Sequence, residues 1–327
     1  MALYIERYEA KYAADWDRLI EESMNGTFLQ TRRFIEYHPE DRFHDHSLLI
    51  FKGNKIVGGI LACEIMESGD KIFFSHKGTT FGGFIISKHI YSAANISELM
   101  EEFEKYIKKE KFDKVYLKQT PAIFQKKNTD LIDYFLYQRG YIQYTELNYH
   151  MDLLNFRDDI LSRFSASKRR DYRYSLKYNL EFKELIEIEE IKEYYEVLQL
   201  NLKKLGLPSV HQFEELIDLK FNRFNERIKF FGIYKEERIV AGSMIFLFDN
   251  NICHTQYLSS DERYLEYYPM EFLIYNLIKY AIQIGNNYFT FGVCTEDRGR
   301  YLNMGLSRFK EGFGTEYCLN KSFEKSF

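Results

Sequence analysis

The chain has 327 residues, of which 45% are hydrophobic and 29% are charged, and its net charge is −4. This length is large for one hydrophobic core and suits two domains of an ordinary globular protein. An acidic surface does not attract nucleic acid or acidic lipid as a whole, so any anion site must come from a local basic patch.

The N-terminal stretch, MALYIERYEAKYAADWDRL, is charged and has no apolar run, which argues against a signal peptide. The longest apolar stretch, Ile239 to Phe248, is too short to cross a bilayer. The four cysteines are far apart and form no C-x-x-C motif, which indicates free thiols in a reducing cytoplasm. His44 and His46 form the closest histidine pair, and two histidines alone do not make a metal site. We therefore expect a cytoplasmic protein without a membrane span or a bound metal.

Two stretches along the chain look alike. LLIFKGNKIVGGILA begins at Leu48 and FGIYKEERIVAGSMI begins at Phe231, an offset of 183 positions (231 − 48). Each has an apolar run, a charged turn and a second apolar run, which predicts a β-hairpin. Each is followed by a further strand, a helix and another strand, the last two being ISELMEEFEKYIKKEKF and KVYLK in the first half and PMEFLIYNLIKYAIQIG and YFTFG in the second. The shared order predicts that the same α/β unit occurs twice.

A basic segment, RFSASKRRDYRYSLKYNLEF, lies between the repeats and begins at Arg163. Two helices are expected after it, around residues 191–205 and 211–224, with Gly206 and Pro208 between them. In the second repeat, Pro269 suits the first turn of the helix and Gly285 suits its end.

Four stretches resemble motifs of the tandem GNAT-type N-acyltransferases, a group that includes the Fem-type peptidyltransferases and their acyl-CoA-using relatives. They are SHKGTTFGG from Ser75, SKRRDYRYSLK from Ser167, HTQYLSS from His254 and FGVCTEDRGRYLNMGLSRFKEGFG from Phe291, of which the last is the most specific. The resemblance covers nearly the whole chain. It implies an α/β (α+β) fold of two tandem GNAT-like domains, each a mixed, largely antiparallel sheet flanked by helices. We place these domains at residues 1–153 and 154–327, with the active-site cleft mainly in the second.

The chain departs from the family pattern in three places. The helices expected between Ile191 and Phe224 are short and lack sustained heptads, whereas Fem enzymes with a long helical arm are thought to use it with aminoacyl-tRNA. The segment SSDERYLEYYPMEF stands where ordinary GNAT enzymes have a glycine-rich pyrophosphate loop. Cys294 stands where the family pattern has a serine, so no hydroxyl role is assigned there.

The stretch NNICHTQYLSS is typical of a strand whose alternation puts His254 and Gln256 on one face and Tyr257 and Ser259 on the other. Polar side chains in a core strand are costly unless they have partners. They either line a functional cleft or form a structural hydrogen-bond network, and we favour the cleft. His254 is then a candidate base near neutral pH. Gln256 and Tyr257 are candidates for substrate binding, and Ser259 and Ser260 for phosphate binding.

The stretch FTFGVCTEDRG predicts a strand that runs into a loop, with Thr295 and Glu296 at the carboxyl end of the strand. Proteins of the α/β class place ligands at such ends. Glu296 could accept a proton from an attacking amine or hold its ammonium form, with Thr295 beside the substrate. A solvated loop acid is an equally good interpretation of Glu296.

The stretch LNMGLSRFKEGFG predicts a final helix that ends at Gly312 or Gly314. Its apolar residues should face the core, with Lys310 beside that face: Leu302, Leu306, Phe309 and Phe313. Residue chemistry alone favours a lysine that interacts with the negative end of the helix dipole. The resemblance implies instead that Phe309 and Lys310 belong to the catalytic centre. Lys310 would then act on developing negative charge or a bound phosphate, and Asn303 would lie near the substrate.

In the basic segment, Arg169, Arg170 and Arg173 could converge on a phosphate from one helix face. A solvated basic helix is the plainer interpretation of such a charge run. The acidity of the rest of the chain makes us favour a functional role.

In SHKGTTFGG, Gly82 and Gly83 could let a ligand approach the backbone, with His76 and Thr80 nearby. A tight turn into the following strand explains the two glycines equally well.

We therefore predict an N-acyltransferase that moves an acyl group from a CoA thioester to an amine. The acceptor would be a small molecule or a nucleotide-linked compound, such as an amino sugar or a precursor of a cell-surface polymer. Acyl-CoA is the expected co-substrate, and no metal takes part. One alternative is a Fem-like peptidyltransferase that uses aminoacyl-tRNA. Another is a non-catalytic ligand-binding protein on the same fold.

Overall fold

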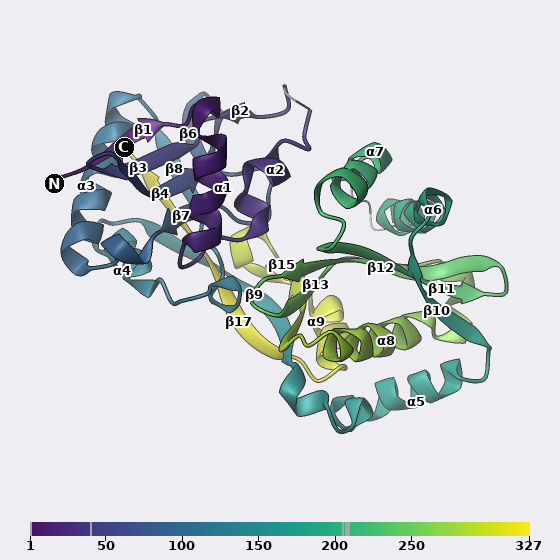
Figure 1. Ribbon diagram of the computed structural model, residues 1–327. Coiled ribbons are helices and arrows are strands. Elements are labelled where there is room, and N and C mark those ends of the chain that lie inside the picture. The colour runs from purple at the N-terminus through teal and green to yellow at the C-terminus, as the bar shows by residue number, and fades with distance from the viewer. Residues whose placement is uncertain (1, 40, 205, 207–209) are drawn as a thin grey trace. The chain divides into compact units, whose positions relative to one another are not determined.

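The chain folds into two compact units. The computed structural model describes residues 2–39, 41–204, 206 and 210–327. Unit 1 comprises residues 1–146, 297–300 and 319–327, and unit 2 comprises residues 147–296 and 301–318. The α/β class that the sequence predicts is confirmed, because each unit combines a mixed sheet with flanking helices (Figure 1). The division into continuous domains at residues 153 and 154 stays a prediction.

Unit 1 contains a four-stranded antiparallel sheet in the order β1-β3-β4-β7, formed by Leu3–Arg7, Leu48–Lys52, Lys55–Leu61 and Gly83–Ile86. Its remaining strands are β2 (His44–Asp45), β5 (Cys63–Glu67), β6 (Asp70–Ser75), β8 (Lys114–Lys118) and part of β17 (Glu316–Ser326). The helices are α1 (Ala13–Glu22), α2 (Arg32–Ile35), α3 (Ala93–Lys109) and α4 (Asp130–Gln138). Helix α3 begins at the Ser92 cap and buries an apolar face in the core of unit 1: Ile96, Leu99, Met100, Phe103 and Ile107.

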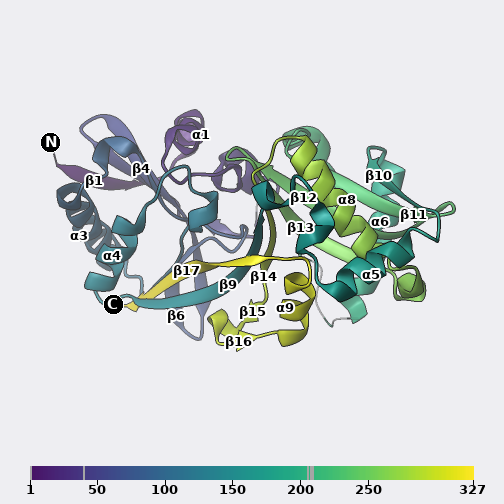
Figure 2. The same ribbon diagram turned by 90° about the horizontal axis from the view of Figure 1, so that it is seen from below.

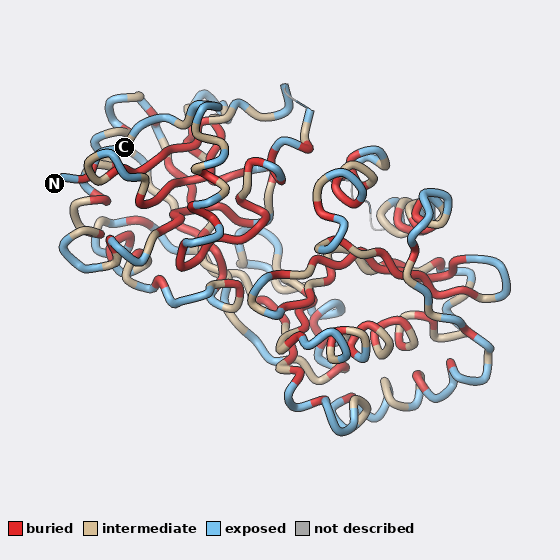
Figure 3. Tube along the Cα trace, in the orientation of Figure 1, coloured by how far each residue is buried: buried red, intermediate tan, exposed pale blue. Residues whose placement is uncertain are grey.

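Unit 2 contains strands in the order β10-β11-β12-β13-β14-β9. They are Leu180–Leu185, Ile228–Lys235, Arg238–Phe248, Ile252–Ser260, Tyr288–Val293 and Ile142–Asp152, of which β9 also has residues in unit 1. All neighbours are antiparallel except β13 and β14. Helices α8 (Pro269–Gln283) and α5 (Ala166–Ser175) lie on one side of the sheet, and α6 (Ile188–Lys204) and α7 (Phe213–Ile217) lie on the other (Figure 1). The strands β11 and β12 are largely buried, whereas the outer side of α5 is exposed (Figure 3).

The two hairpins of the predicted repeat are confirmed, whereas three strands, β5, β6 and β7, follow the hairpin of unit 1 before its helix and one strand, β13, does so in unit 2. The hairpins β3–β4 and β11–β12 are both antiparallel, and each has a register shift, between Ile50 and Phe51 in unit 1 and between Ile233 and Tyr234 in unit 2. These two bulges are also 183 positions apart (233 − 50). Bulges in two unrelated hairpins would not be expected at equivalent positions. Their recurrence at the same offset therefore supports a common origin of the two units.

The predicted helix boundaries agree in part. Pro269 starts α8, and the chain turns at Gly285 with φ +82°. The first of the two mid-chain helices, predicted around residues 191–205, is α6, whose described part ends at Lys204. Residues 205 and 207–209, including Pro208, lie outside the described residues. The second is shorter than predicted, since α7 passes at Asp218 into a π-helical segment.

Candidate active site

The parallel strands of unit 2 separate at the position where the sequence places its candidate residues. β13 and β14 are paired only from Ile252↔Tyr288 to His254↔Thr290. Beyond that point β13 follows β12 to its half-buried end at Ser260, whereas β14 follows β9. The carboxyl ends of neighbouring parallel strands are a common place for ligands in α/β proteins.

A bulge in β13 changes which side chains share a face. The register pairs Phe246 with His254 and Met244 with Tyr257, so the half-buried Gln256 is the extra residue. Phe246 and Met244 are two positions apart on β12 and therefore face the same way. His254 and Tyr257 consequently lie on one face of the sheet. The predicted alternation, which puts them on opposite faces, is wrong because it assumes an unbroken strand.

The face that carries His254 and Tyr257 is covered by α6 and the segment before α7. The hydroxyl of Tyr257 and Nδ1 of His211 are 2.5 Å apart. Tyr194 of α6 packs so closely that a Cβ on Gly242 would lie 2.5 Å from its ring, and Ser259 lies against the Tyr194 hydroxyl. Tyr257 thus has the structural hydrogen-bond partner that the sequence left open as an alternative, whereas Oγ of Ser259 is buried and has no hydrogen-bond partner among the described residues.

Lys310 is not an exposed lysine at a helix end. It lies on α9 (Met304–Glu311), beside β14 (Figure 2), and its side chain is 4% exposed. Nζ donates to the carbonyl oxygens of Phe291 at 2.8 Å, Gly292 at 3.1 Å and Val293 at 2.8 Å. Three acceptors match the three N–H groups of an ammonium, since a neutral amine would offer only two. We call these three carbonyls the carbonyl cup.

An irregular backbone makes the carbonyl cup possible. Successive carbonyls of a regular strand point in alternating directions, so three in a row cannot face one atom. In β14 the register against β9 shifts between Thr290 and Gly292, and Gly292 has φ +70°. Only glycine adopts this conformation without strain. A Cβ at Gly292 would lie 3.4 Å from Cε1 of His254, which places the imidazole directly beside the cup.

The electrostatics of the cup follow from burial. Burial lowers the pKa of the Lys310 ammonium. Burial, followed by the Lys310 charge, lowers the pKa of His254 to about 4, so its imidazole is neutral at pH 7. Burial raises the pKa of the Cys294 thiol, while the Lys310 charge acts in the opposite direction. In the part of the chain that the structure describes, no carboxylate pairs with Lys310, so its charge is balanced only by dipoles.

A second group of residues, which the sequence analysis missed, holds α9 in place. The hydroxyl of the fully buried Tyr149 donates to Ser307 at 2.7 Å, and Ser307 donates to Glu311 at 2.9 Å. Lys310 Nζ lies 5.6 Å from the centroid of the Tyr149 ring. Ser307 and Lys310 are three positions apart on the helix, so both face inward. The only sign of this group in the sequence was Ser307, a polar residue one helical turn before Lys310.

The loop after β14 gives the remaining C-terminal candidates different roles. Thr295 and Glu296 form a short strand, β15, paired with β16 (Tyr301–Leu302). Glu296 is exposed, whereas Oγ1 of Thr295 is buried and has no hydrogen-bond partner among the described residues. Asn303 caps α9, because its Oδ1 accepts from the amide of Leu306 at 3.1 Å. Its predicted contact with the substrate stays a prediction.

Helix α5 presents a different cation from those predicted. Lys168 pairs with Glu271 of α8 at 2.5 Å, and its ammonium lies 4.5 Å from the ring centroid of Phe309 and 4.9 Å from that of Phe313. Phe309 is half-buried, and Leu306, which was expected in the core, is 40% exposed. The buried face of α9 therefore differs from the face that the apolar pattern predicts. The reason is that Lys310 points inward to bond with the carbonyl cup.

The three predicted arginines of α5 have different contacts in the structure. Nη1 of Arg169 donates to the carbonyl of Ser162 at 3.4 Å, and Arg170 pairs with Asp171 at 3.0 Å. Arg170 and Arg173 are exposed. The predicted binding of a phosphate by these arginines stays a prediction.

The candidates in SHKGTTFGG belong to unit 1. Nδ1 of His76 accepts from the amide of Gly78 at 2.9 Å, its side chain is buried, and burial lowers its pKa to about 4. A Cβ on Gly82 would lie 3.0 Å from the Leu61 carbonyl, and one on Gly83 would lie 2.6 Å from the Gln119 side chain. Protein atoms thus occupy the space that a ligand would need beside these glycines, while Thr80 is exposed.

Unit 1 also contains a buried cation that the sequence analysis missed. Arg32 is 3% exposed and lies 3.5 Å from the ring centroid of Tyr8 and 4.3 Å from that of Trp16. Its Nη1 pairs with Asp45 at 2.7 Å, which holds the Asp45 carboxylate in its charged form. Tyr8, Trp16 and Arg32 are separated in the sequence and form no local motif. The sequence therefore did not predict that they pack together.

Two features are absent from the residues that the structure describes. No group of three histidine, cysteine, aspartate or glutamate side chains within them could hold a metal ion. None of their helices is long and apolar enough to cross a membrane.

Comparisons with known proteins agree with this architecture. Residues 166–311 match the family model of the acetyltransferase (GNAT) domain. No curated protein sequence matches significantly. Among solved structures, FemX superimposes with a TM-score of 0.71 at 13% identity, covering 98% of this chain and 97% of FemX.

Two other solved structures have the same fold. L-PGS from Bacillus licheniformis gives a TM-score of 0.60 at 14% identity, covering 97% of this chain and 92% of that one. A tandem GNAT protein from the clavulanic acid biosynthesis pathway gives 0.56 at 9% identity, covering 99% and 98%. The chain therefore has the fold of the tandem GNAT-like proteins, and residues 166–311, which include the carbonyl cup, match the acetyltransferase (GNAT) domain.

Proposed function

We propose that the protein transfers an acyl group from a CoA thioester to the amine of a small-molecule or nucleotide-linked acceptor, at the carboxyl ends of β13 and β14. The observation that carries this proposal is a buried ammonium, Lys310, held beside a neutral imidazole where the two strands separate. The amine nitrogen bonds to the acyl carbon, the carbon–sulfur bond breaks, and the amine proton ends on the thiolate. An amino sugar or a precursor of a cell-surface polymer would fit this acceptor chemistry.

Lys310 contributes through its field in this mechanism. All three of its N–H groups are used by the carbonyl cup, so the ammonium does not donate directly to the oxyanion. A positive charge without a carboxylate partner still lowers the energy of negative charge that develops nearby, and more so in a site of low dielectric. The cup fixes the position of that charge, which removes the need for reorganisation during the reaction.

His254 is the stronger candidate for handling the amine proton. It is neutral at pH 7, which leaves a ring nitrogen able to accept a proton from the tetrahedral intermediate. Glu296 is exposed on β15 and would have to act through water. His254 also lies directly beside Gly292 of the cup.

The donor's phosphates would not sit at the start of α8, where the sequence lacks a glycine-rich loop. Glu271 lies in the first turn of that helix and pairs with Lys168, so a carboxylate already occupies the positive end of the dipole. The exposed Arg170 and Arg173 of α5 are the better candidates for holding them. The four free thiols support a reducing compartment such as the cytoplasm for the reaction.

Ligand-dependent stabilisation together with a turnover assay tests the proposal. Acetyl-CoA at one hundred times its Kd should stabilise the protein by about 2.7 kcal/mol, and a thiol reagent should report CoA release when an amine is added. Replacing both Arg170 and Arg173 by alanine should weaken acyl-CoA binding, whereas the exposed Arg157→Ala serves as the matched control. Absence of any acyl-CoA effect on melting would refute the donor assignment.

A Fem-like reaction with aminoacyl-tRNA is the second candidate. The exposed arginines on α5, in a chain with a net charge of −4, are the observation that favours it. In that case aminoacyl-tRNA should bind with a steep salt dependence. Binding of tRNA together with no response to CoA thioesters would replace the first proposal by this one.

A further inference from the structure

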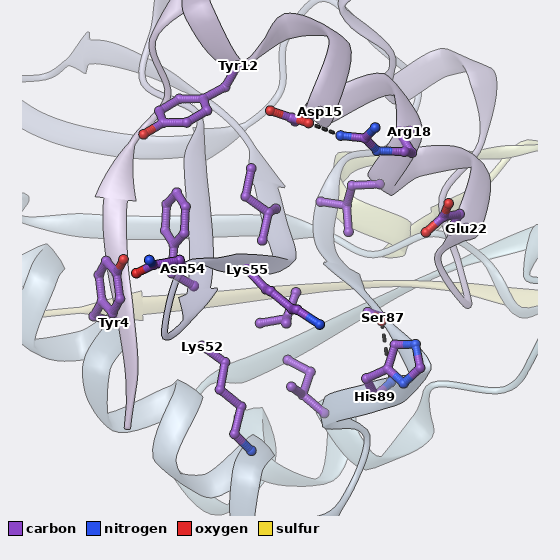
Figure 4. Close-up of a pocket in the computed structure, with 15 residues that line it drawn as sticks. Tyr4, Tyr12, Asp15, Arg18, Glu22, Lys52, Asn54, Lys55, Ser87 and His89 are labelled. Carbon is purple, nitrogen blue, oxygen red and sulfur yellow. Dashed lines mark hydrogen bonds and ion pairs between the residues drawn. The ribbon is translucent and has the colours of Figure 1, made fainter. Parts of the chain in front are cut away.

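A hollow of about 840 Å³ lies beside the β3–β4 hairpin of unit 1 (Figure 4). The strand register puts Lys52 and Lys55 on the side of the sheet that faces α3, whereas Tyr4 and Phe51, one residue along each strand, face α1. The charged and aromatic side chains of this hollow therefore cannot contact one small ligand together. In unit 2, by contrast, a chain of buried polar side chains ends at one backbone amide of the carbonyl cup.

The irregular backbone of the carbonyl cup is held by a side chain of the same strand. The amide of Gly292 donates to Oγ1 of Thr290, two residues earlier, at 3.1 Å. A threonine oxygen that accepts from the amide two residues on closes a local turn, which competes with a regular strand. This turn coincides with the register shift between Thr290 and Gly292 and with the positive φ of Gly292. The Thr290 hydroxyl therefore fixes the conformation in which three successive carbonyls face Lys310.

The direction of the Thr290 hydroxyl is set from the neighbouring strand. Its oxygen accepts from Gly292, and its one proton is donated to Oδ1 of Asn148 on β9, at 3.4 Å. Nδ2 of Asn148 donates to Sγ of Cys318 on β17 at 3.2 Å, which leaves Oδ1 to face Thr290. Thr290 is fully buried and Asn148 is 1% exposed, so both are shielded from bulk water. Three hydrogen bonds thus run in sequence from β17 to the cup.

Thr290 and Lys310 approach the cup from opposite faces of the sheet. Thr290 is the parallel register partner of His254, so these two side chains lie on one face. Tyr149 follows Asn148 on β9 and points to the other face, where its ring lies 5.6 Å from Nζ of Lys310. A side chain on the face of His254 can therefore control where the ammonium is held, through the backbone of the cup.

The internal repeat shows that a strand in this position does not need such a chain. β8 is the counterpart of β14, because each follows the long helix of its unit and pairs in parallel with one earlier strand. KVYLK of β8 places Tyr116 and Lys118 where YFTFG has Thr290 and Gly292, and its register against β17 is unbroken. The buried threonine, the glycine and the shifted register thus occur together, in the unit with the cup. A purely structural role would be filled as well by an apolar side chain, since a buried hydroxyl costs free energy unless it is bonded.

We propose that Thr290 is a positioning residue of the acyl-transfer site. Its hydroxyl, oriented by Asn148, holds the amide of Gly292. It thereby fixes the carbonyl cup, the position of the Lys310 ammonium and the place of Gly292 beside His254. The effect of Thr290 on turnover rests on the proposed function, whereas its effect on the cup does not, so the two effects are measured separately.

Thr290→Ser and Thr290→Ala test the hydroxyl, because both side chains are smaller than threonine and differ from each other by one oxygen. In protein with isotope-labelled lysine, the Lys310 ammonium should give a proton NMR signal near neutral pH, because a buried, hydrogen-bonded ammonium exchanges its protons slowly with water. The signal is identified by its absence from Lys310→Met. Thr290→Ser should keep the exchange rate within about twofold, whereas Thr290→Ala should raise it about fivefold or more, the factor for one lost hydrogen bond.

Thr255→Ala is the matched control for the loss of a buried hydroxyl. Thr255 is 4% exposed, and its hydroxyl donates to the carbonyl of Thr290 at 3.2 Å, outside the cup. This variant should lose about as much stability in urea unfolding as Thr290→Ala, but it should leave the exchange rate of the Lys310 ammonium unchanged.

Turnover with acyl-CoA and an amine gives the second readout. Thr290→Ala should lower kcat about 10- to 100-fold and change KM less than about threefold, because a small displacement of a positioned group affects the chemical step more than binding. Thr290→Ser, which restores the hydroxyl, should recover most of kcat.

The outcomes separate the positioning role from the proposed function. An unchanged exchange rate in Thr290→Ala, or an equal change in Thr255→Ala, would overturn the positioning role whatever the turnover shows. Faster exchange in Thr290→Ala alone, in a protein that turns over no CoA thioester, would support the role of Thr290 in holding Lys310 and reject the proposed donor. Faster exchange with an unchanged kcat would overturn the role of Thr290 in turnover.

Discussion

Replacing Lys310 by methionine tests whether the buried ammonium is part of the structure as well as the site. The change keeps most of the side-chain volume but removes three hydrogen bonds to the carbonyl cup. Each buried acceptor left without its donor costs about 1 kcal/mol at the lower end of the usual range, so the loss should be about 3 kcal/mol. With 2–4 °C per kcal/mol for a domain of this size, Tm should fall by about 6–12 °C.

Urea unfolding followed by circular dichroism measures this loss, and Lys109→Met provides the matched control. Lys109 lies in the last turn of α3 and is exposed, so its replacement should change the free energy of unfolding by no more than about 0.5 kcal/mol. From the sequence alone, Lys310→Arg would be expected to fold normally. The planar guanidinium of arginine cannot direct three N–H groups at the cup as an ammonium does. The Lys310→Arg variant should therefore also be destabilised. If Lys310→Met is as stable as Lys109→Met, the argument from the carbonyl cup fails.

Two further predictions concern stability. Gly299 has φ +87°, and a Cβ there would lie 1.7 Å from the Thr145 carbonyl, whereas Gly140 has φ +80° and open space around it; Gly299→Ala should therefore cost several kcal/mol more than Gly140→Ala in urea unfolding, and equal losses would refute the steric account. The buried His76 has a folded pKa of about 4 against an unfolded value near 6.5, so the unfolded state binds more protons between these values. Its contribution to stability is complete above pH 6.5 and lost as pH falls to 4, with a slope of up to about 1.4 kcal/mol per pH unit. His76→Asn should flatten that part of the stability curve, and an unchanged slope would contradict the assignment.

The fold could be predicted from the sequence where a pattern repeats, or where a proline or glycine marks the end of a helix. The two hairpins share an offset that is visible in the letters, and Pro269 and Gly285 mark the ends of α8. The bulge at Gln256 could not be predicted, because nothing in a strand of alternating side chains announces an extra residue. It is this residue that brings Tyr257 to the face of His254.

The candidate site residues came from the sequence, and their roles stay predictions. Family resemblance pointed to Lys310, the strand end pointed to Thr295 and Glu296, and the polar side chains of a core strand pointed to His254. The burial of Lys310 was not predicted. The apolar pattern of a helix carries no information about three carbonyl acceptors on a neighbouring strand. The capping role of Asn303 was also not predicted, because the sequence does not show which group its amide oxygen accepts from.

The return of the chain's last segment to unit 1 has a consequence during protein synthesis. β17 pairs with β8 from Ser322↔Lys118 to Ser326↔Lys114, and Phe323 is fully buried in the core that also contains Leu3 and Leu48. A ribosome that has synthesised residues 1–318 has therefore not yet supplied the unit 1 part of β17 or the core ring of Phe323. Since domains tend to fold in the order of their synthesis, the N-terminal unit would wait for the C-terminal one. A nascent chain stalled before residue 319 would expose the edge of β8, which is where a chaperone would find an unpaired strand.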